Sequence, residues 1–409
     1  MSLASLRPLR ERDFALIWSA ALVSNIGSWM QTVAVGVLVT EATGRAGWTG
    51  LVAAAAFLPI GLLSPVGGAL ADRVHRRPLL VLTTLGETTF AALLAVLAAT
   101  GHATPVVVTM VVLGGGCMAA LGFPAYQAIL PELVDKEDLL GAISLSTAQY
   151  NLGRVAGPAL AGVVVAVGSY ELAFALNALS FGAVLVAVSL VRLPPPVPTQ
   201  EEGNIWRRIR TGARGAMAEP GCRTAIFAIG VTAFLLSPFI ALIPAVALKL
   251  FGSKESGTAT LVTAQGVGAV AGALILGSLA RKWGRRRTLV VNLAVLPWLL
   301  VLYALAPNLP SAVVALTLVG AGYIGVLSGL ATVVQLRAPA ALRGRILSFY
   351  MVALGTIYPI GAVVQGAVGD HLGMRAVTVG CAGAFLAVAV LAARIRPDLV
   401  VALDDPVRD

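Results

Sequence analysis

Long apolar stretches separated by polar segments recur along the whole chain. Each of the twelve that can be traced is near or above the roughly 20 residues that a helix needs to cross the hydrocarbon core of a bilayer. Because that layer holds no water to satisfy backbone groups, these stretches are expected to be helices. Their approximate limits are residues 15–39, 47–71, 78–100, 104–130, 140–167, 170–191, 223–248, 258–280, 288–306, 309–335, 346–369 and 374–393.

Composition supports lipid as the surrounding solvent. Of the 409 residues, 58% are hydrophobic and 12% are charged, whereas a soluble domain has about 45–50% apolar and about 25% charged residues. A chain this apolar cannot cover its folded surface with polar groups. The sequence therefore predicts an all-α membrane protein with 12 transmembrane helices.

The positive charges lie unevenly along the chain. If the N-terminus is cytoplasmic, 24 of the 29 Lys and Arg residues fall on the cytoplasmic side and four fall outside, with Arg154 left inside a span. This asymmetry follows the positive-inside rule. It predicts an inner or plasma membrane protein with both termini cytoplasmic, and it explains the net charge of +10 without a nucleic acid partner. The first apolar stretch is expected to be an uncleaved span rather than a signal peptide.

The longest polar segment divides the spans into six and six. We expect an N-terminal six-helix bundle over 1–191, a cytoplasmic linker over 192–222, a C-terminal six-helix bundle over 223–393 and a cytoplasmic tail over 394–409. Within the linker, residues 205–210 (IWRRIR) are typical of a short basic amphipathic helix on the anionic inner leaflet. The alternative is a solvated linker.

A short pattern repeats in the two halves. Residues 68–80 (GALADRVHRRPLL) and 277–289 (GSLARKWGRRRTL) both have G-x-L-A, two polar residues and a basic run before the next apolar stretch. Parallel repeats of this kind indicate two halves related by an axis along the membrane normal.

The repeat resembles the signature loop of the major facilitator superfamily, G-x-L-A-D-R-x-G-R-K-x-x-L. The first copy has His75 in place of the loop glycine, and the second has Arg281 in place of the acid. The resemblance implies two pseudo-symmetric six-helix bundles and a conformational latch in which Asp72 pairs with the N-terminal end of the eleventh span. The implied latch residues are Gly68, Asp72, Arg73 and Arg76 in the first half, and Gly277, Gly284 and Arg285 in the second. The alternative is that these charges only set the orientation.

A second motif lies in the fifth span. Residues 153–162 (GRVAGPALAG) resemble the antiporter motif G-x-x-x-G-P-x-x-G-G of the same superfamily, with Ala161 in place of one glycine. The resemblance implies an exporter, with roles for Gly153, Arg154, Gly157, Pro158 and Gly162. The proline removes a backbone hydrogen bond and the glycines allow close helix packing, so the alternative is a purely structural motif.

Two further runs narrow the resemblance. Residues 339–348 (PAALRGRILS) and 124–133 (PAYQAILPEL) resemble the drug and siderophore exporter branch that includes the enterobactin exporter. The fourth span, however, lacks the arginine that many drug exporters carry there. Proton-coupling schemes that depend on that arginine do not transfer to this chain.

Ionisable groups at membrane depth are candidates for function. Glu87 in the third span is the candidate proton site, because desolvation favours the protonated carboxyl; its alternatives are a structural partner for Arg154 or a hydroxyl, or neither role. Arg154 shares a helical stripe with Thr147 and Asn151. It is expected either to face the seam between the halves or to bridge backbone carbonyls.

Polar side chains on inward stripes are the candidate substrate ligands. They hydrogen-bond either a substrate or a neighbouring helix, and the sequence leaves this open. The candidates are Asn25, Ser28, Trp29, Thr32, Asn151, Arg154, Tyr358 and Gln365.

These features together predict a secondary active exporter that works by alternating access, with proton antiport as the energy source. The cargo would be a small molecule such as a drug, a siderophore or a metabolite. The alternatives are a nutrient or ion symporter of the same fold, and an intramembrane enzyme or sensor. We expect no enzyme activity, no cofactor and no metal, since no Walker loop, catalytic cluster or metal-ligand spacing is present. We expect a monomer.

Overall fold

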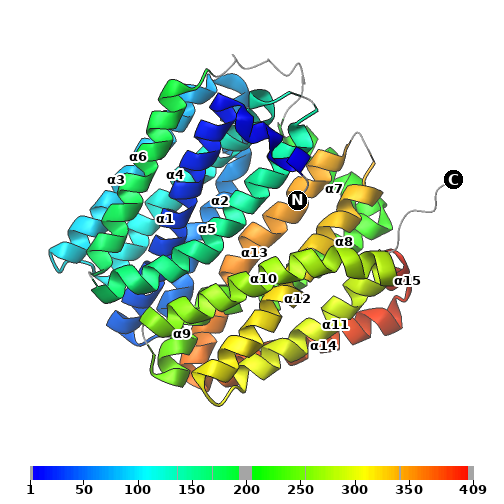
Figure 1. Cartoon of the computed structure of the whole chain (residues 1–409). Coiled ribbons are helices and arrows are strands. Elements are labelled where there is room, and N and C mark those ends of the chain that lie inside the picture. Colours follow the sequence, from blue (N-terminus) through cyan, green and yellow to red (C-terminus); the bar gives the residue numbers. More distant parts are fainter. Residues whose placement is uncertain are drawn as a thin grey trace. The chain divides into compact units, whose positions relative to one another are not determined.

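The computed structural model describes residues 3–135, 137–167, 169–192, 205–253, 255–339 and 342–403. Across these ranges the chain is helical and has no strand (Figure 1). Eleven segments of this part of the chain are long and apolar enough to cross a membrane. The structure thus confirms the predicted all-α membrane fold.

The chain divides into two compact units, and the first consists of Met1–Gly44, Leu51–Gln200 and Gly252–Thr263. Within it α1 packs along α5 and α6, and α3 packs along α4 and α6. A buried cluster that includes Phe14, Ile17, Leu80 and Ile129 joins these helices. The elements are η1 (Leu3–Arg10), α1 (Arg12–Thr43), α2 (Ala46–Arg73), α3 (Arg76–Ala99), α4 (Pro105–Ile129), η2 (Leu130–Leu133), α5 (Leu139–Val167) and α6 (Tyr170–Leu190).

The second unit consists of Arg45–Gly50, Glu201–Phe251 and Ala264–Asp409. Within it α13 packs against α8, and α11 packs against α12 and α14. Its helices are α7 (Ile205–Ala218), α8 (Pro220–Leu235), α9 (Phe239–Phe251), α10 (Glu255–Trp283), α11 (Arg285–Ala304), α12 (Leu309–Arg337), α13 (Arg343–Leu372), α14 (Met374–Ile395) and α15 (Asp398–Val401).

Two helices begin in one unit and continue in the other. The first residues of α2, up to Gly50, belong to the second unit, and the rest of α2 belongs to the first. The first residues of α10, up to Thr263, belong to the first unit, and the remainder belongs to the second. α2 and α10 are the second and eighth spans, so they occupy equivalent places in the sequence repeat.

The seventh span differs from its prediction as one continuous helix. It is divided into α8 and α9 at residues 236–238, where Pro238 has no N–H to continue the ladder. The fifth predicted span forms the helix α5 and carries Gln149, Asn151 and Arg154. It is not among the eleven segments found in the described residues. Segment α7 is helical from Ile205 onward and packs on α13, while its position on the inner leaflet stays a prediction.

Candidate functional site

The glycines of the α5 motif allow close contact between α5 and α1. A Cβ atom added at Gly153 would lie 2.8 Å from the Cβ of Asn25, and one added at Gly157 would lie 2.6 Å from the Cβ of Trp29. Only glycine allows two helices to approach this closely. Helix packing is therefore one role of this motif, in line with the structural alternative predicted from the sequence.

The same approach brings a cation onto an aromatic ring. The guanidinium carbon of Arg154 lies 5.6 Å from the centre of the Trp29 ring, within the range of a cation–π interaction. Trp29 also meets Tyr150 edge to face, with ring centres 6.0 Å apart. The group Trp29, Tyr150 and Arg154 is called the α1–α5 cluster below. Tyr150 was not among the predicted site residues, although its place four residues before Arg154 puts it on the same helix face.

The other predicted polar residues of these helices form local hydrogen bonds. The Thr32 hydroxyl donates to the Ser28 carbonyl oxygen over 2.8 Å, and the Asn151 amide donates to the Thr147 carbonyl oxygen over 2.8 Å. Asn25 and Ser28 are half-buried. A ligand at Thr32 or Asn151 would have to compete with these bonds, and the substrate role of all four residues stays a prediction.

Glu87 is half-buried on α3. Its neighbour Thr83 is buried and donates to the Leu79 carbonyl oxygen of the same helix over 2.9 Å. This hydroxyl is therefore already paired inside α3. Arg154, the other partner considered from sequence, lies over Trp29.

The structure describes only some of the residues predicted to form the latch of the first half. The Arg76 guanidinium forms an ion pair with Glu132 of η2, within the first unit. Gly68 has open space where a Cβ would lie. The side chains of Asp72 and Arg73 lie outside the described residues, and the pairing of Asp72 with the start of α13 stays a prediction.

The corresponding loop of the second half has a different backbone. Gly284 precedes α11 with φ +82°, a left-handed conformation that favours glycine, whereas His75 precedes α3 with φ −57°. This explains why the first copy tolerates a histidine at the glycine position. Beside the second loop, Gly277, Arg285 and Arg337 line a cavity of about 190 Å³ between α10, α11 and α12.

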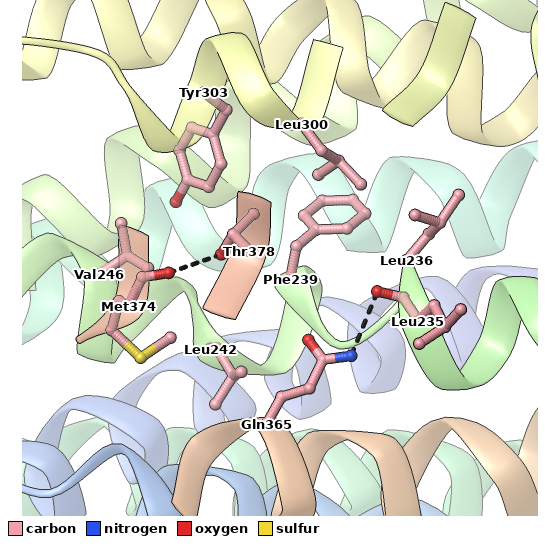
Figure 2. A pocket seen from close by; sticks show the side chains of 10 residues that line it. All are labelled: Leu235, Leu236, Phe239, Leu242, Val246, Leu300, Tyr303, Gln365, Met374 and Thr378. Carbon is pink, nitrogen blue, oxygen red and sulfur yellow. Dashed lines mark hydrogen bonds between the residues drawn. The ribbon is translucent and has the colours of Figure 1, made fainter. Parts of the chain in front are cut away.

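Gln365, a predicted substrate ligand on α13, lies at the break in the seventh span. Its side-chain amide donates to the carbonyl oxygen of Phe234 over 2.6 Å. It also donates to the carbonyl oxygen of Leu235 over 3.2 Å (Figure 2). Tyr323 of α12 donates to the Ser237 hydroxyl over 2.9 Å. Irregular backbone is tolerated at membrane depth when protein groups satisfy it. Gln365 thus stabilises the end of α8, and its contact with a substrate stays a prediction.

The space around this break is small. Gln365, Tyr303 and Thr378 help to line a cavity of about 10 Å³, and Figure 2 shows the Tyr303 ring directed into it. The Tyr303 hydroxyl is buried and has no partner among the described residues. A space of this size holds about one water molecule, so it cannot hold a drug or a siderophore. Tyr358, the other candidate on α13, is half-buried.

Sequence reasoning missed Asp370 near the end of α13. Its carboxylate accepts hydrogen bonds from the backbone N–H groups of Ala46 and Gly47, over 2.6 and 2.9 Å, and pairs with Lys249 over 2.6 Å. All of these residues belong to the second unit. The sequence did contain a signal: Asp370 is an acidic residue at the end of an otherwise apolar stretch. Lys249 likewise stands at the end of the seventh apolar stretch.

A second carboxylate, Glu219, caps the start of α8. It accepts from the Cys222 N–H over 2.6 Å and from Arg337 of α12 over 2.7 Å. Burial alone would raise the pKa of Glu219, but these hydrogen bonds outweigh burial and hold that pKa below its usual range. The pair ties the start of α8 to the end of α12.

Sequence comparisons match the chain over nearly its whole length. A family model described as transmembrane secretion effector matches residues 3–404. The multidrug efflux pump Tap of Mycolicibacterium fortuitum is 27% identical over 88% of this chain and 90% of its own length. The enterobactin exporter EntS of Shigella boydii is 30% identical over 87% of this chain and 85% of its own length.

Solved structures share the fold. A bacterial homolog of the human lysosomal transporter Spinster is similar with a TM-score of 0.75, at 13% identity and over 100% of both chains. A transporter of the POT family has a TM-score of 0.75 at 11% identity, over 95% of this chain and 96% of its own. At such identities the likeness concerns the fold.

Proposed function

The chain belongs to the transmembrane secretion effector family of the major facilitator superfamily, and we propose that it exports small molecules by alternating access, driven by proton antiport. The family consists of membrane transporters rather than enzymes. The observation that supports export is the family match across residues 3–404, together with relatives that are named as a multidrug efflux pump and an enterobactin exporter. A multi-pass protein of this family belongs in the plasma membrane, and we propose cytoplasmic termini and a monomer.

The α1–α5 cluster supports a cargo site on these two helices. A guanidinium over an indole ring offers a positive charge beside an apolar, polarisable surface. This combination suits an amphipathic molecule with an aromatic ring or an anionic group, as in a drug, a siderophore or a metabolite. The half-buried Asn25 and Ser28 lie on α1, the helix that carries Trp29, and would supply hydrogen bonds to the cargo.

The cargo site is tested by substitutions at Arg154. Arg154→Lys keeps the charge but loses the planar group that stacks, and Arg154→Gln removes the charge. We expect cargo efflux from cells to fall in the order wild type, Arg154→Lys, Arg154→Gln, with the larger change in the apparent KM. Equal efflux by all three proteins at limiting cargo would remove Arg154 from the site.

Glu87 supports proton coupling because it is a half-buried carboxylate on a membrane-spanning helix. In proteoliposomes with an imposed pH gradient, Glu87→Gln should abolish gradient-driven accumulation while counterflow exchange of cargo continues. Glu41→Gln is the matched control; Glu41 accepts a hydrogen bond from Tyr170 over 2.6 Å in the same unit. Gradient-driven transport by Glu87→Gln at the wild-type rate would exclude Glu87 as the proton site.

A symporter of the same fold is the alternative. Direction of flux separates the two: an exporter accumulates cargo in inverted membrane vesicles when their interior is acidic, whereas an importer with proton symport accumulates it in right-side-out vesicles under an inward proton gradient. Accumulation in the right-side-out vesicles alone would overturn the export proposal.

A further inference from the structure

Asp370 is bonded on both carboxylate oxygens. Oδ1 accepts from the Ala46 N–H and from Lys249, and Oδ2 accepts from the Gly47 N–H. Arg45 lies at 3.8 Å from Oδ2 but is 62% exposed, while the Asp370 side chain is 8% exposed. The contact is therefore a nearly buried carboxylate held by two backbone donors and one ammonium group.

The donors lie in the first turn of α2. The N–H groups of a first turn have no partner within their own helix, and the helix dipole places partial positive charge there. Asp370 satisfies two of these groups from a position 324 residues further along the chain. A buried carboxylate without such partners is strongly unfavourable, so Asp370 and the start of α2 each require the other in this arrangement.

Glycines bring the two helices close enough for this contact. A Cβ added at Gly50 would collide with the Ala362 carbonyl oxygen, and one added at Gly366 would collide with the Ala46 carbonyl oxygen. A Cβ added at Gly47 would lie 3.4 Å from the Ala367 Cα, an ordinary van der Waals contact. Moving forward along α2 from Ala46 to Gly50 therefore means moving backward along α13, so the two segments run antiparallel.

Lys249 lies on a short helix, α9, which is preceded by a break in the seventh span. It lies in the last turn of α9, and α9 is separated from α8 at residues 236–238. Gln365, about one turn before Asp370 on α13, holds the carbonyl groups at that break. The last turns of α13 thus contact the start of α2, the end of α9 and the break between α8 and α9.

We propose that Asp370 is a positioning residue for transport, which caps the first turn of α2 and pairs with Lys249 while the outer side of the transporter is closed, and releases α2 when that side opens. This inference rests on the proposed alternating access and on the proposed orientation, which places both groups outside. The expected Asp72 contact would be its counterpart: a carboxylate at the other end of α2 that caps the start of α13. The antiparallel helix pair would then carry one carboxylate cap at each end, used in alternate states.

The test is the rate of disulfide formation between α2 and α13. A cysteine pair, Gly47→Cys with Ala367→Cys, is introduced after Cys117, Cys222 and Cys381 are replaced by alanine; a Cβ at Gly47 would lie 3.4 Å from the Ala367 Cα, so the two positions are in contact. The same Cβ would lie 3.1 Å from Asp370 Oδ2, so every rate is compared with that of the parent cysteine pair. Asp370→Asn in this background should slow disulfide formation about tenfold, because a charged acceptor of three hydrogen bonds is lost. Lys249→Gln should slow it by a smaller factor. Disulfide formation at the parent rate in Asp370→Asn would overturn the proposal.

A charge exchange separates capping from a simple ion pair. Asp370→Lys combined with Lys249→Asp restores opposite charges but places an ammonium group at the start of α2, where a positive charge is unfavourable. We expect this double variant to form the disulfide as slowly as Asp370→Asn. Recovery of the parent rate would show that the ion pair suffices and would overturn the capping role. Glu219→Gln, which alters a different helix cap, is the control and should leave the rate unchanged.

The readout needs neither cargo nor a gradient. If Asp370→Asn slows disulfide formation but the wild type exports nothing, the cap stands and the export proposal fails. If the wild type exports cargo and Asp370→Asn forms the disulfide at the parent rate, the export proposal stands and the capping proposal is overturned.

Discussion

The starts of α2 and α8 are both capped by a carboxylate that also binds a cation, yet the two caps are built differently. Glu219 directly precedes α8 and bonds to Cys222 and Arg337. Asp370 reaches α2 from α13, 324 residues away in sequence, and binds Lys249. A local cap is present whenever its helix forms, whereas a remote cap also needs two helices to stay together. The same chemistry can therefore stabilise the fold at one helix and a single conformation at another.

The largest effect that we predict comes from blocking the approach behind the remote cap. Gly50→Val places side-chain atoms against the backbone carbonyl of Ala362, which cannot move aside without shifting α13. Overpacking of this kind costs about 1–3 kcal/mol, so the closed arrangement of α2 on α13 should lose on the order of tenfold or more in population. The measurements are cargo efflux and the rate of disulfide formation at positions 47 and 367.

Gly182→Ala is the control for added volume, because a Cβ there has open space around it in α6. It should leave both rates unchanged. If Gly50→Val also transports and forms the disulfide normally, close contact between α2 and α13 is not needed for function.

The next effect concerns the local cap. Glu219→Gln removes the charge that receives hydrogen bonds from Cys222 and Arg337 but keeps an acceptor oxygen, so only part of the about 1.5–3 kcal/mol that a hydrogen bond to a charged group contributes is lost. We expect a lower midpoint of thermal unfolding in detergent, while the disulfide rate between α2 and α13 stays the same. A shift in that rate with no change in Tm would mean that the two caps do not differ as proposed.

The stabilisation by Glu219 should depend on pH. Its folded-state pKa is lowered, so its contribution is fully present above the unfolded value of about 4.3 and is lost as the pH falls through the folded-state pKa. The difference in Tm between wild type and Glu219→Gln should accordingly be constant from pH 7 to about pH 5 and shrink below about pH 4. A difference that grows on acidification would contradict the assignment of the charge to Glu219.

The local cap and the remote cap also show what sequence could predict. Hydropathy predicted the spans because lipid acts on each helix separately, and the position of Gly284 in the repeat agreed with its left-handed backbone. The motif at Gly153 and Gly157 predicted close packing, although the partner helix α1 became known from the structure. Local information sufficed for these features.

Asp370 could not be assigned in the same way. Nothing near residue 370 in sequence indicates that its partners are the N–H groups of residues 46 and 47, because that contact depends on how distant helices pack. The break at residues 236–238 was missed for a related reason: Gln365 of α13 satisfies backbone carbonyl groups at the break, and Tyr323 of α12 bonds to the Ser237 hydroxyl there. The expected cap by Asp72 is predicted from a sequence motif. The Asp370 cap is observed in the structure, and no sequence motif predicts it.

The smallest effect that we predict belongs to a third carboxylate at a helix start. Asp398 begins α15 and pairs with Arg396 over 3.3 Å, and this hydrogen bond holds the pKa of Asp398 below its usual value. Both side chains are more than half exposed, and water and salt screen such pairs strongly. Asp398→Asn should leave Tm, efflux and the disulfide rate unchanged. The three carboxylates at helix starts would then differ by burial. The exposed Asp398 would have no measurable effect, the largely buried local cap Glu219 would stabilise the fold, and the largely buried remote cap Asp370 would select a conformation. A fall in Tm for Asp398→Asn as large as that for Glu219→Gln would show that burial does not set this order.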